Sequence, residues 1–96
     1  MSPHPISLLV MTWNEGHNLA RCLESVPFAD EKIVVDSGST DDTVKVAEAH
    51  GARVVSQPWL GFGPQRNFAT ALARNDWILF LDADEALSPE LAREIE

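Results

Sequence analysis

Short apolar runs alternate along the chain with stretches in which apolar residues have helical spacing. The runs span residues 6–11, 32–36, 52–56 and 77–81, and each has the length of a strand. Helical spacing follows each run, over residues 17–26, at Val44, Val46 and Ala47, at Phe68, Ala69 and Leu72, and at Leu91, Ala92 and Ile95. This alternation predicts a mostly parallel sheet with helices on both faces. We therefore expect an α/β protein with a Rossmann-like, three-layer α/β/α fold.

The last apolar run, from Trp77 to Leu81, is the strongest of these signals. It is unbroken, so we expect a strand buried on both faces, as in a parallel sheet. Carboxylates follow at Asp82, Asp84 and Glu85. On a continued strand Asp82 and Asp84 point the same way, and their repulsion favours a cation such as Mg²⁺ or Mn²⁺ beside them. The plainer interpretation is a solvated turn, and we expect Glu85 to be a solvated neighbour.

Polar residues also follow the earlier strands, and in parallel sheets ligands bind beyond the carboxyl ends of the strands. The candidates are Thr12, Asn14 and Glu15 after the first strand, Asp36 and Ser37 after the second, and Asp82 and Asp84 after the fourth. Arg66 can reach the same edge, where its planar guanidinium suits a phosphate or a base. Asp36 has two open interpretations, because it can cap its own turn or accept hydrogen bonds from a base or ribose.

Aromatic and acidic residues near this edge are less specific signals. Trp13 and Trp59 can stack on a base or simply pack against the protein. We expect Asp41 and Asp42 to be acids at the start of a helix, where the helix dipole favours negative charge. Cys22 lies on the apolar stripe of a helix, so we expect it in the core.

Length and charge limit the possible functions. A chain of 96 residues indicates one small domain, and a net charge of -8 argues against nucleic acid or an anionic membrane as a partner. The single cysteine allows no internal disulfide. The N-terminus lacks a basic region, and the apolar run after it is too short to span a bilayer. We therefore expect a cytoplasmic protein.

Several stretches, taken in order, resemble the N-terminal motifs of the family 2 glycosyltransferases, which have the GT-A fold. They are residues 11–15 (MTWNE), 33–41 (IVVDSGSTD), 65–67 (QRN) and 79–85 (LFLDADE). The DSGSTD variant and the GFGPQRN segment are most similar to the branch that includes the lipopolysaccharide core β-glucosyltransferases. The motifs follow the family's order and spacing over nearly the whole chain, which makes the resemblance specific.

The resemblance implies an enzyme that moves a sugar, with inversion, from a nucleoside-diphosphate sugar to an acceptor hydroxyl. It favours a UDP-sugar donor, a glycan or lipid-linked acceptor, and a role in lipopolysaccharide or other cell-envelope glycan synthesis, either in the cytoplasm or at the inner face of the membrane. It places Mn²⁺ or Mg²⁺ at Asp84 and Asp82. It assigns to the nucleotide pocket Thr12, Asn14, Glu15, Asp36, Ser37, Arg66 and Asp82.

The chain departs from the family pattern in two ways. Ser37 stands where the family has a second aspartate, a position that often reads the base. The family's general base and acceptor site lie in its C-terminal half, so we name no catalytic base. We expect residues 1–96 to be the donor-binding part of a GT-A domain, with an exposed sheet edge that favours self-association.

Other interpretations of the same motifs stay open. A nucleotide- and metal-binding fragment without catalytic turnover is the main alternative. A phosphohydrolase of the haloacid dehalogenase type is weaker, because Ala86 stands where Thr or Val is expected and the motif comes last in the chain. A response-regulator receiver domain needs a later lysine, and the chain has none after Lys45.

Overall fold

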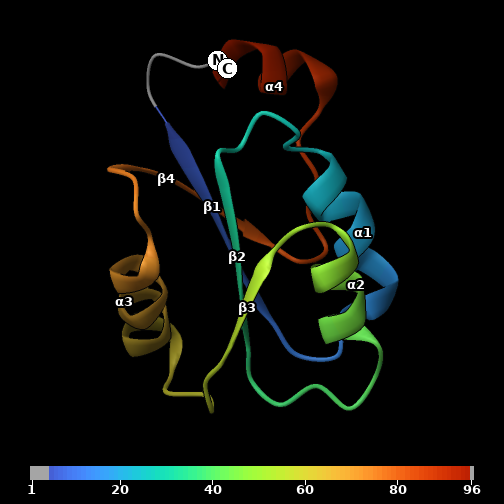
Figure 1. The fold of residues 1–96 in the computed structure, drawn as a ribbon, viewed down its shortest axis with the longest axis vertical. Coiled ribbons are helices and arrows are strands. Elements are labelled where there is room, and N and C mark those ends of the chain that lie inside the picture. The colour runs from blue at the N-terminus through green and yellow to red at the C-terminus, as the bar shows by residue number, and fades with distance from the viewer. Residues whose placement is uncertain (1–4, 96) are drawn as a thin grey trace.

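Four parallel strands form one sheet in the order β3-β2-β1-β4 in a computed structural model, which describes residues 5–95 (Figure 1). The elements follow one another as β1 (Ile6–Thr12), α1 (Gly16–Glu24), β2 (Glu31–Asp36), α2 (Thr43–Ala49), β3 (Arg53–Ser56), α3 (Phe62–Leu72), β4 (Trp77–Asp82) and α4 (Pro89–Ile95). This alternation and the parallel pairing confirm the predicted α/β fold.

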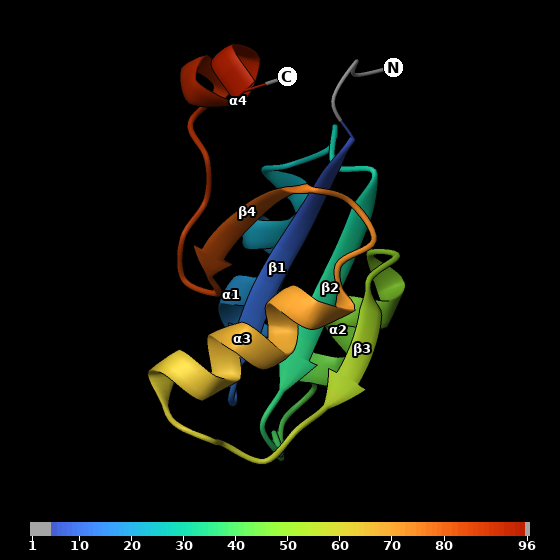
Figure 2. The ribbon, with the colours of Figure 1, turned by 90° about the vertical axis from the view of Figure 1, so that its left-hand side faces the viewer.

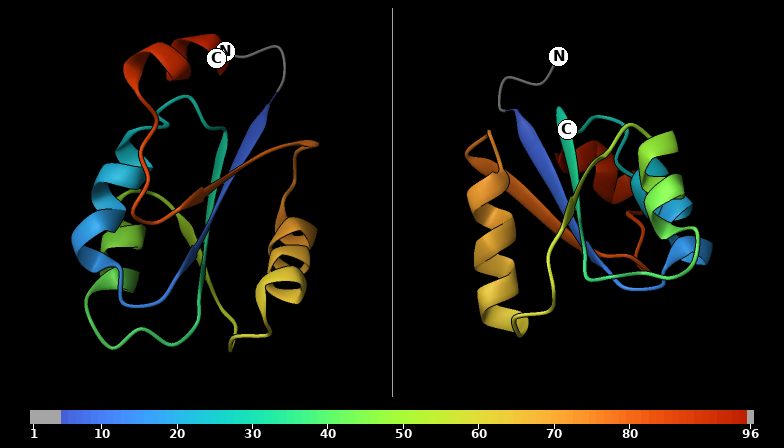
Figure 3. Two further views of the ribbon diagram at one scale, coloured as in Figure 1. Left: turned by 180° about the vertical axis from the view of Figure 1, so that it is seen from behind. Right: turned by 60° about the horizontal axis from the view of Figure 1, so that its bottom comes forward.

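Helices cover both faces of the sheet, as Figures 2 and 3 show. α1 and α2 lie on one face and α3 lies on the other. α4 lies toward the end of the sheet where the strands begin, and it has no buried residue (Figure 1). The short strand-to-helix loops bring the carboxyl ends of the strands to one edge of the domain, as predicted.

The side chains of β1 alternate between two cores, which explains why this strand is apolar at almost every position. Leu8 and Val10 pack with the helices α1 and α2. Leu9 points to the other face, toward Ala69 of α3. The predicted stripe of α1 is confirmed, since its apolar residues are fully buried, including Cys22. β1 is therefore the central support of the sheet.

The burial predicted for β4 is wrong. β4 pairs with β1 alone and stands at an edge of the described sheet, so none of its residues is fully buried. Trp77 at its start is 59% exposed. An apolar run fixes the length of a strand, whereas its burial depends on neighbours that the run does not specify. Self-association through such an edge stays a prediction.

None of the helices in residues 5–95 combines the length and apolar character that a membrane span requires. Residues 1–4, on which the prediction of a cytoplasmic protein partly depends, lie outside the described residues.

Candidate functional site

A cavity of about 620 Å³ opens at the carboxyl ends of β1, β2 and β4. It lies at the edge where the parallel sheet predicts a ligand site. The predicted site residues that line it are Thr12, Glu15, Ser37, Asp82 and Asp84. Asn14, Asp36 and Arg66, which were also predicted, are not among the lining residues. The structure thus separates the predicted residues into a group that lines the cavity and a group that does not.

Asp36, which does not line the cavity, is the centre of a hydrogen-bond network. It is only 4% exposed, and both carboxylate oxygens accept hydrogen bonds. Oδ1 accepts from the hydroxyls of Thr12 at 2.7 Å and Ser39 at 2.5 Å. Oδ2 accepts from the backbone N–H groups of Gly38 at 3.2 Å and Ser39 at 2.8 Å. The structure shows Asp36 capping its own turn, whereas a contact with a base or ribose stays a prediction.

These hydrogen bonds also set the charge state of Asp36. Burial alone would raise the pKa of this carboxyl group. The donors from Ser39, Thr12 and Gly38 outweigh burial and hold the pKa below its ordinary value. Asp36 is therefore ionised at neutral pH, and its charge is stabilised by donors from its own loop and from Thr12.

Asn14 fastens the loop after β1 to the loop after β2. Its backbone has a positive φ of 53°, a conformation that asparagine tolerates better than most residues. Its N–H donates to the Ser39 hydroxyl at 2.8 Å, and its side-chain oxygen accepts from the Thr40 N–H at 2.7 Å. Asn14 therefore holds the two loops together, whereas a contact with a nucleotide stays a prediction.

Helix α1 is capped by residues from the other loop. The Glu15 N–H donates to the Thr43 hydroxyl at 3.0 Å, and the Gly16 N–H donates to Asp41 Oδ2 at 3.1 Å. Asp41 Oδ1 also accepts from the Thr43 N–H at 2.9 Å at the start of α2. The predicted place of Asp41 at a helix start is confirmed, and it serves two helices. Hydrogen bonds, led by the Thr43 hydroxyl, lower the pKa of Asp41.

The turn after β4 is built differently. β4 ends at Asp82, because the Glu85 N–H donates to the Asp82 carbonyl at 2.9 Å and Glu85 Oε1 accepts from the Asp82 N–H at 2.7 Å. The expectation that a continued strand aligns Asp82 with Asp84 is therefore wrong. Glu85 is not merely a solvated neighbour, because its side chain closes this turn.

The carboxylates of Asp82 and Asp84 are left open. Both residues are exposed and line the cavity, and neither carboxylate accepts a hydrogen bond from any other part of residues 5–95. No group of three or more acidic, His or Cys side chains in the described chain is placed to hold a metal ion. A hard divalent cation takes one or two carboxylates and completes its shell with water and phosphate oxygens. This open pair fits such a cation.

Two side chains of α1 support the backbone of this turn. Arg21 Nη2 donates to the Asp84 carbonyl at 3.2 Å, and Cys22 Sγ donates weakly to the Asp82 carbonyl at 3.7 Å. Burial first, and then the nearby acids, raise the pKa of the Cys22 thiol to about 11, so it stays protonated. Sequence reasoning did not identify Arg21, because 63 positions separate it from Asp84.

An aromatic group forms another wall of the cavity. Trp13, Trp59 and Phe62 line it, and they are 64%, 51% and 82% exposed. The rings of Trp59 and Phe62 meet edge to face, with centroids 5.0 Å apart. Large exposed rings at a cavity favour ligand contact over the packing interpretation. Phe62 was not identified from the sequence, although glycines on both sides marked it as a residue of an open loop.

Gln65 holds this aromatic loop against the cavity. It is fully buried, and its Oε1 accepts from the Leu60 N–H at 3.0 Å. Its Nε2 donates to the Ser37 hydroxyl at 3.2 Å. Arg66, the next residue, has its guanidinium over the Phe80 ring, with Cζ 4.2 Å from the ring centroid. Its predicted role near a nucleotide therefore stays a prediction.

The sequence matches known glycosyltransferases over almost its whole length. The sequence model of the family described as Glycosyl transferase family 2 matches residues 7–95. An uncharacterized glycosyltransferase of Rickettsia felis is 55% identical over 92 residues, which are 95% of this chain and 32% of that protein. The lipopolysaccharide core biosynthesis glycosyltransferase LpsC of Rhizobium meliloti is 34% identical over 92 residues, or 91% of this chain and 34% of LpsC. The chain spans about a third of the length of these relatives.

Solved structures show the same fold. Glucosyl-3-phosphoglycerate synthase of Mycobacterium tuberculosis, solved in complex with Mn²⁺, UDP and glucosyl-3-phosphoglycerate, superposes with a TM-score of 0.70 at 30% identity, over 88% of this chain and 36% of that one. Mannosyl-3-phosphoglycerate synthase of Rubrobacter xylanophilus gives a TM-score of 0.78 at 27% identity, over 92% of this chain and 33% of that one. The family model and these structures together confirm the predicted GT-A type of α/β fold, whereas its assignment to the N-terminal, donor-binding part stays a prediction. By sequence and by structure, the chain belongs to glycosyl transferase family 2.

Proposed function

We propose that the cavity binds a nucleoside-diphosphate sugar and that the whole protein transfers the sugar, with inversion, to an acceptor hydroxyl. The observation that carries this proposal is the pair of open carboxylates, Asp82 and Asp84, in one cavity with the exposed aromatic wall. A charged diphosphate with its cation suits the first feature, and a flat base or sugar ring suits the second. We favour UDP, which is bound in the solved mycobacterial synthase.

The loops after β1 and β2 form the nucleoside side of the proposed site. Thr12 and Ser37 line the cavity, and each is held by a side-chain hydrogen bond. The Thr12 hydroxyl donates to Asp36, and the Ser37 hydroxyl accepts from Gln65. Glu15 adds a carboxylate that can accept a hydrogen bond from a ribose hydroxyl. Because the hydrogen bonds through Asp36 and Asn14 fix these loops before a ligand arrives, little order has to be gained on binding.

The turn after β4 forms the diphosphate side. Asp84 and Asp82 would hold Mn²⁺ or Mg²⁺, and Arg21 keeps the Asp84 backbone in place. When bound, the ion offsets the negative charge that gathers on the diphosphate as the glycosidic bond breaks. In this proposal the carboxylates hold the ion and the locked loops orient the nucleoside, so that the anomeric carbon faces the acceptor.

The proposed direction of attack follows from inversion at the anomeric carbon, and the proposed class of acceptor follows from a relative. Inversion requires the acceptor hydroxyl to attack the anomeric carbon from the face opposite the diphosphate. A glycan or lipid-linked acceptor in the cell envelope is our choice, because LpsC acts in lipopolysaccharide core biosynthesis. We place the reaction in the cytoplasm or at the inner face of the membrane. We assign no general base among the described residues.

Calorimetric titration with UDP and with GDP, each with and without Mn²⁺, tests the donor site. We expect UDP binding that depends on Mn²⁺ and is lost in Asp84→Ala. Asp76→Ala is the matched control, since this exposed acid lies outside the cavity. Equal binding by both variants would overturn the proposal. Release of UDP from a UDP-sugar when an acceptor is added separates a transferase from a module that only binds.

A further inference from the structure

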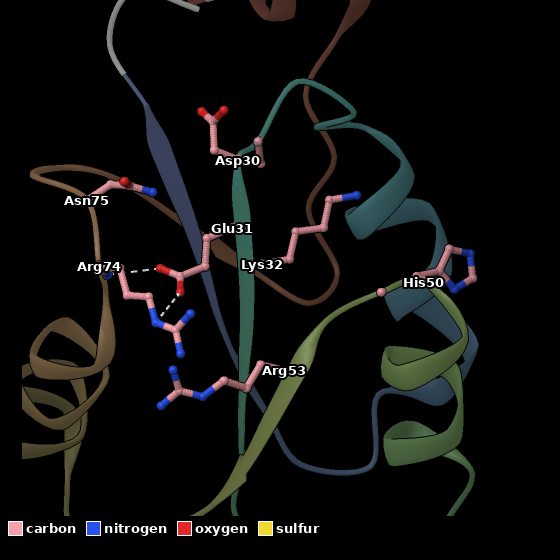
Figure 4. Close-up of a pocket in the computed structure, with 9 residues that line it drawn as sticks. Asp30, Glu31, Lys32, His50, Arg53, Arg74 and Asn75 are labelled. Atoms are coloured by element: carbon pink, nitrogen blue, oxygen red, sulfur yellow. Dashed lines mark hydrogen bonds and ion pairs between the residues drawn. The ribbon is translucent and has the colours of Figure 1, made fainter. Parts of the chain in front are cut away.

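A second cavity lies at the opposite end of the sheet, where the strands begin (Figure 4). Its volume is also about 620 Å³. Its lining includes Lys32 of β2, Arg53 of β3 and Arg74 in the loop before β4, together with His50 after α2. The acids Asp30 and Glu31 line the same cavity, and the Asp30 carboxylate accepts from the Ile6 N–H at 2.8 Å and points away from both arginines (Figure 4).

Two of the basic residues at this cavity already have partners on the α1 side of the sheet. Lys32 Nζ donates to the Leu23 carbonyl at 3.2 Å, near the end of α1. His50 Nε2 lies 3.0 Å from Glu24 Oε2, which joins α2 to α1. Figure 4 shows both side chains directed toward the helices α1 and α2. These contacts stabilise the fold, and they leave Arg53 and Arg74 as the cations to be explained.

One carboxylate, that of Glu31, pairs with Arg74 and lies within the electrostatic influence of Arg53. Glu31 Oε1 accepts from the Arg74 N–H at 2.9 Å and from the Ser7 hydroxyl at 2.8 Å, and Glu31 Oε2 lies 3.6 Å from Arg74 Nε. Burial opposes the charge of Glu31, but these donors and the guanidinium groups of Arg74 and Arg53 hold its pKa below the ordinary value. Glu31 is therefore ionised, with two hydrogen bonds at Oε1 and the ion pair with Arg74 at Oε2.

Arg53 and Arg74 extend toward each other on the same side of the sheet (Figure 4). Within the described residues, Arg53 makes no hydrogen bond or ion pair, and the Arg74 side chain is 76% exposed. The two guanidinium groups face one acid, so together they keep a net positive charge that a further anion can neutralise. Protection of the edge strand β3 would explain Arg53, and the ion pair with Glu31 explains the position of Arg74, but neither explains why the two guanidiniums extend toward each other.

We propose that Arg53 and Arg74 form a binding site for a phosphate-type anion at the amino-terminal end of the sheet. The planar forks of two guanidiniums match the oxygens of a phosphate or diphosphate group, which they can bind in a bidentate way. The side-chain amide of Asn75, at the same cavity, already donates to the Ser7 hydroxyl at 3.1 Å and fixes the loop that carries Arg74. The anion comes from a soluble phosphate compound or from a lipid headgroup.

This site does not depend on the proposed donor site, because it lies at the other end of the strands and needs no metal ion. Binding of pyrophosphate to the full chain without divalent cations, followed by amide NMR shifts, tests it. We expect shifts centred on Arg53, Arg74 and Asn75. Because each bidentate contact is charge-assisted, Arg53→Gln should weaken binding about tenfold. Arg53→Lys, which keeps the charge but loses the fork, should give an intermediate affinity.

Two matched variants complete the test. Arg93→Gln removes the same charge from the exposed helix α4 and should bind pyrophosphate as the unmodified chain does. Asp84→Asn alters the other cavity and should also leave this binding unchanged. Equal loss in Arg93→Gln and Arg53→Gln, or shifts centred away from Arg53 and Arg74, would show a general charge effect and overturn the proposal.

Vesicles distinguish the two sources of the anion. Binding to phosphatidylglycerol vesicles but not to phosphatidylcholine vesicles, lost in Arg53→Gln, would support a lipid headgroup. Binding of pyrophosphate without vesicle binding would support a soluble ligand. Failure to bind either probe at Arg53 and Arg74 would overturn the proposal.

Discussion

The two sides of the carboxyl-end cavity are built on different principles. On one side, the loops after β1 and β2 are tied together by side chains that accept or donate to the other loop, with buried Asp36 at the centre. On the other side, the turn after β4 is held through its backbone by Glu85 and Arg21. The carboxylates of Asp82 and Asp84 remain open to the cavity.

The difference indicates that one side of the cavity fixes the loop conformation, whereas the other side presents free negative charge. A carboxylate that already accepts four hydrogen bonds, as Asp36 does, has no capacity left for a cation, so its contribution is to fix the loop. An exposed carboxylate such as Asp84 adds little to folding and can bind an ion. In the proposed function, acids that follow neighbouring strands therefore have different roles, and mutations should separate them.

The largest effect is expected from Asp36→Asn. The new NH₂ group would face N–H and O–H groups that now donate hydrogen bonds to the carboxylate. These buried donors would be left without an acceptor. We expect a loss of about 3 kcal/mol in the free energy of unfolding, measured by urea denaturation. Asp76→Asn is the control, because Asp76 is exposed and should change stability little. A stable Asp36→Asn protein would mean that the loops are not held by this residue.

The next effect is expected from Asp84→Asn, and it concerns binding rather than folding. Loss of one of two open carboxylates should weaken Mn²⁺-dependent UDP binding by about 100-fold, the effect of losing one ligand from a site with few protein ligands. The free energy of unfolding should stay within about 0.5 kcal/mol of the unmodified value, because this side chain is exposed. A destabilised variant would contradict the proposed separation of roles.

Low pH should destabilise the side of the cavity formed by the loops after β1 and β2. The pKa of Asp36 is lower in the folded protein than its ordinary value of 3.8, so its stabilising effect is complete above pH 3.8 and is lost as the pH falls through the folded-state pKa. Urea denaturation at a series of pH values should show this loss in the unmodified protein and in Asp84→Asn. The loss should be smaller in Asp36→Asn, and an unchanged profile there would argue against this assignment.

The smallest effect is expected from Arg21→Gln. Its contact with the Asp84 carbonyl is exposed, so the fold should tolerate the change. The open turn should become less ordered, and Mn²⁺ affinity should fall about tenfold, as expected for a residue that only supports the ligands. Arg21→Lys should restore part of the affinity because it retains a donor. A fully folded variant with unchanged Mn²⁺ affinity would remove Arg21 from the site.

The sequence predicted the fold well because apolar runs and helical stripes determine which faces are buried. β1 is the best example, with both faces in a core. β4 shows where this prediction fails, because the sequence of a strand does not determine how many other strands pair with it. The edge of the sheet that holds the cavity also followed from strand order, and Thr12, Glu15, Ser37, Asp82 and Asp84 do line it.

Finer features of the site did not follow from the sequence because they depend on contacts between distant residues. Asp36 resembled a ligand residue as much as a turn cap until its donors, from both loops, were placed. Gln65 and Ser37 are 28 positions apart, and no local pattern links them. The D-x-D spacing suggested an extended strand, whereas Glu85 closes a turn at Asp82 and so ends the strand before Asp84.

Paramagnetic broadening by Mn²⁺ tests the central claim most directly. With UDP present, small additions of Mn²⁺ should broaden the amide NMR signals of residues 82–85 first, and Asp84→Asn should abolish this pattern. The exposed acids Asp41 and Asp42, which do not line the cavity, offer an alternative place for a cation. Broadening centred on them, or unchanged in Asp84→Asn, would contradict the account in which the turn after β4 supplies the charge.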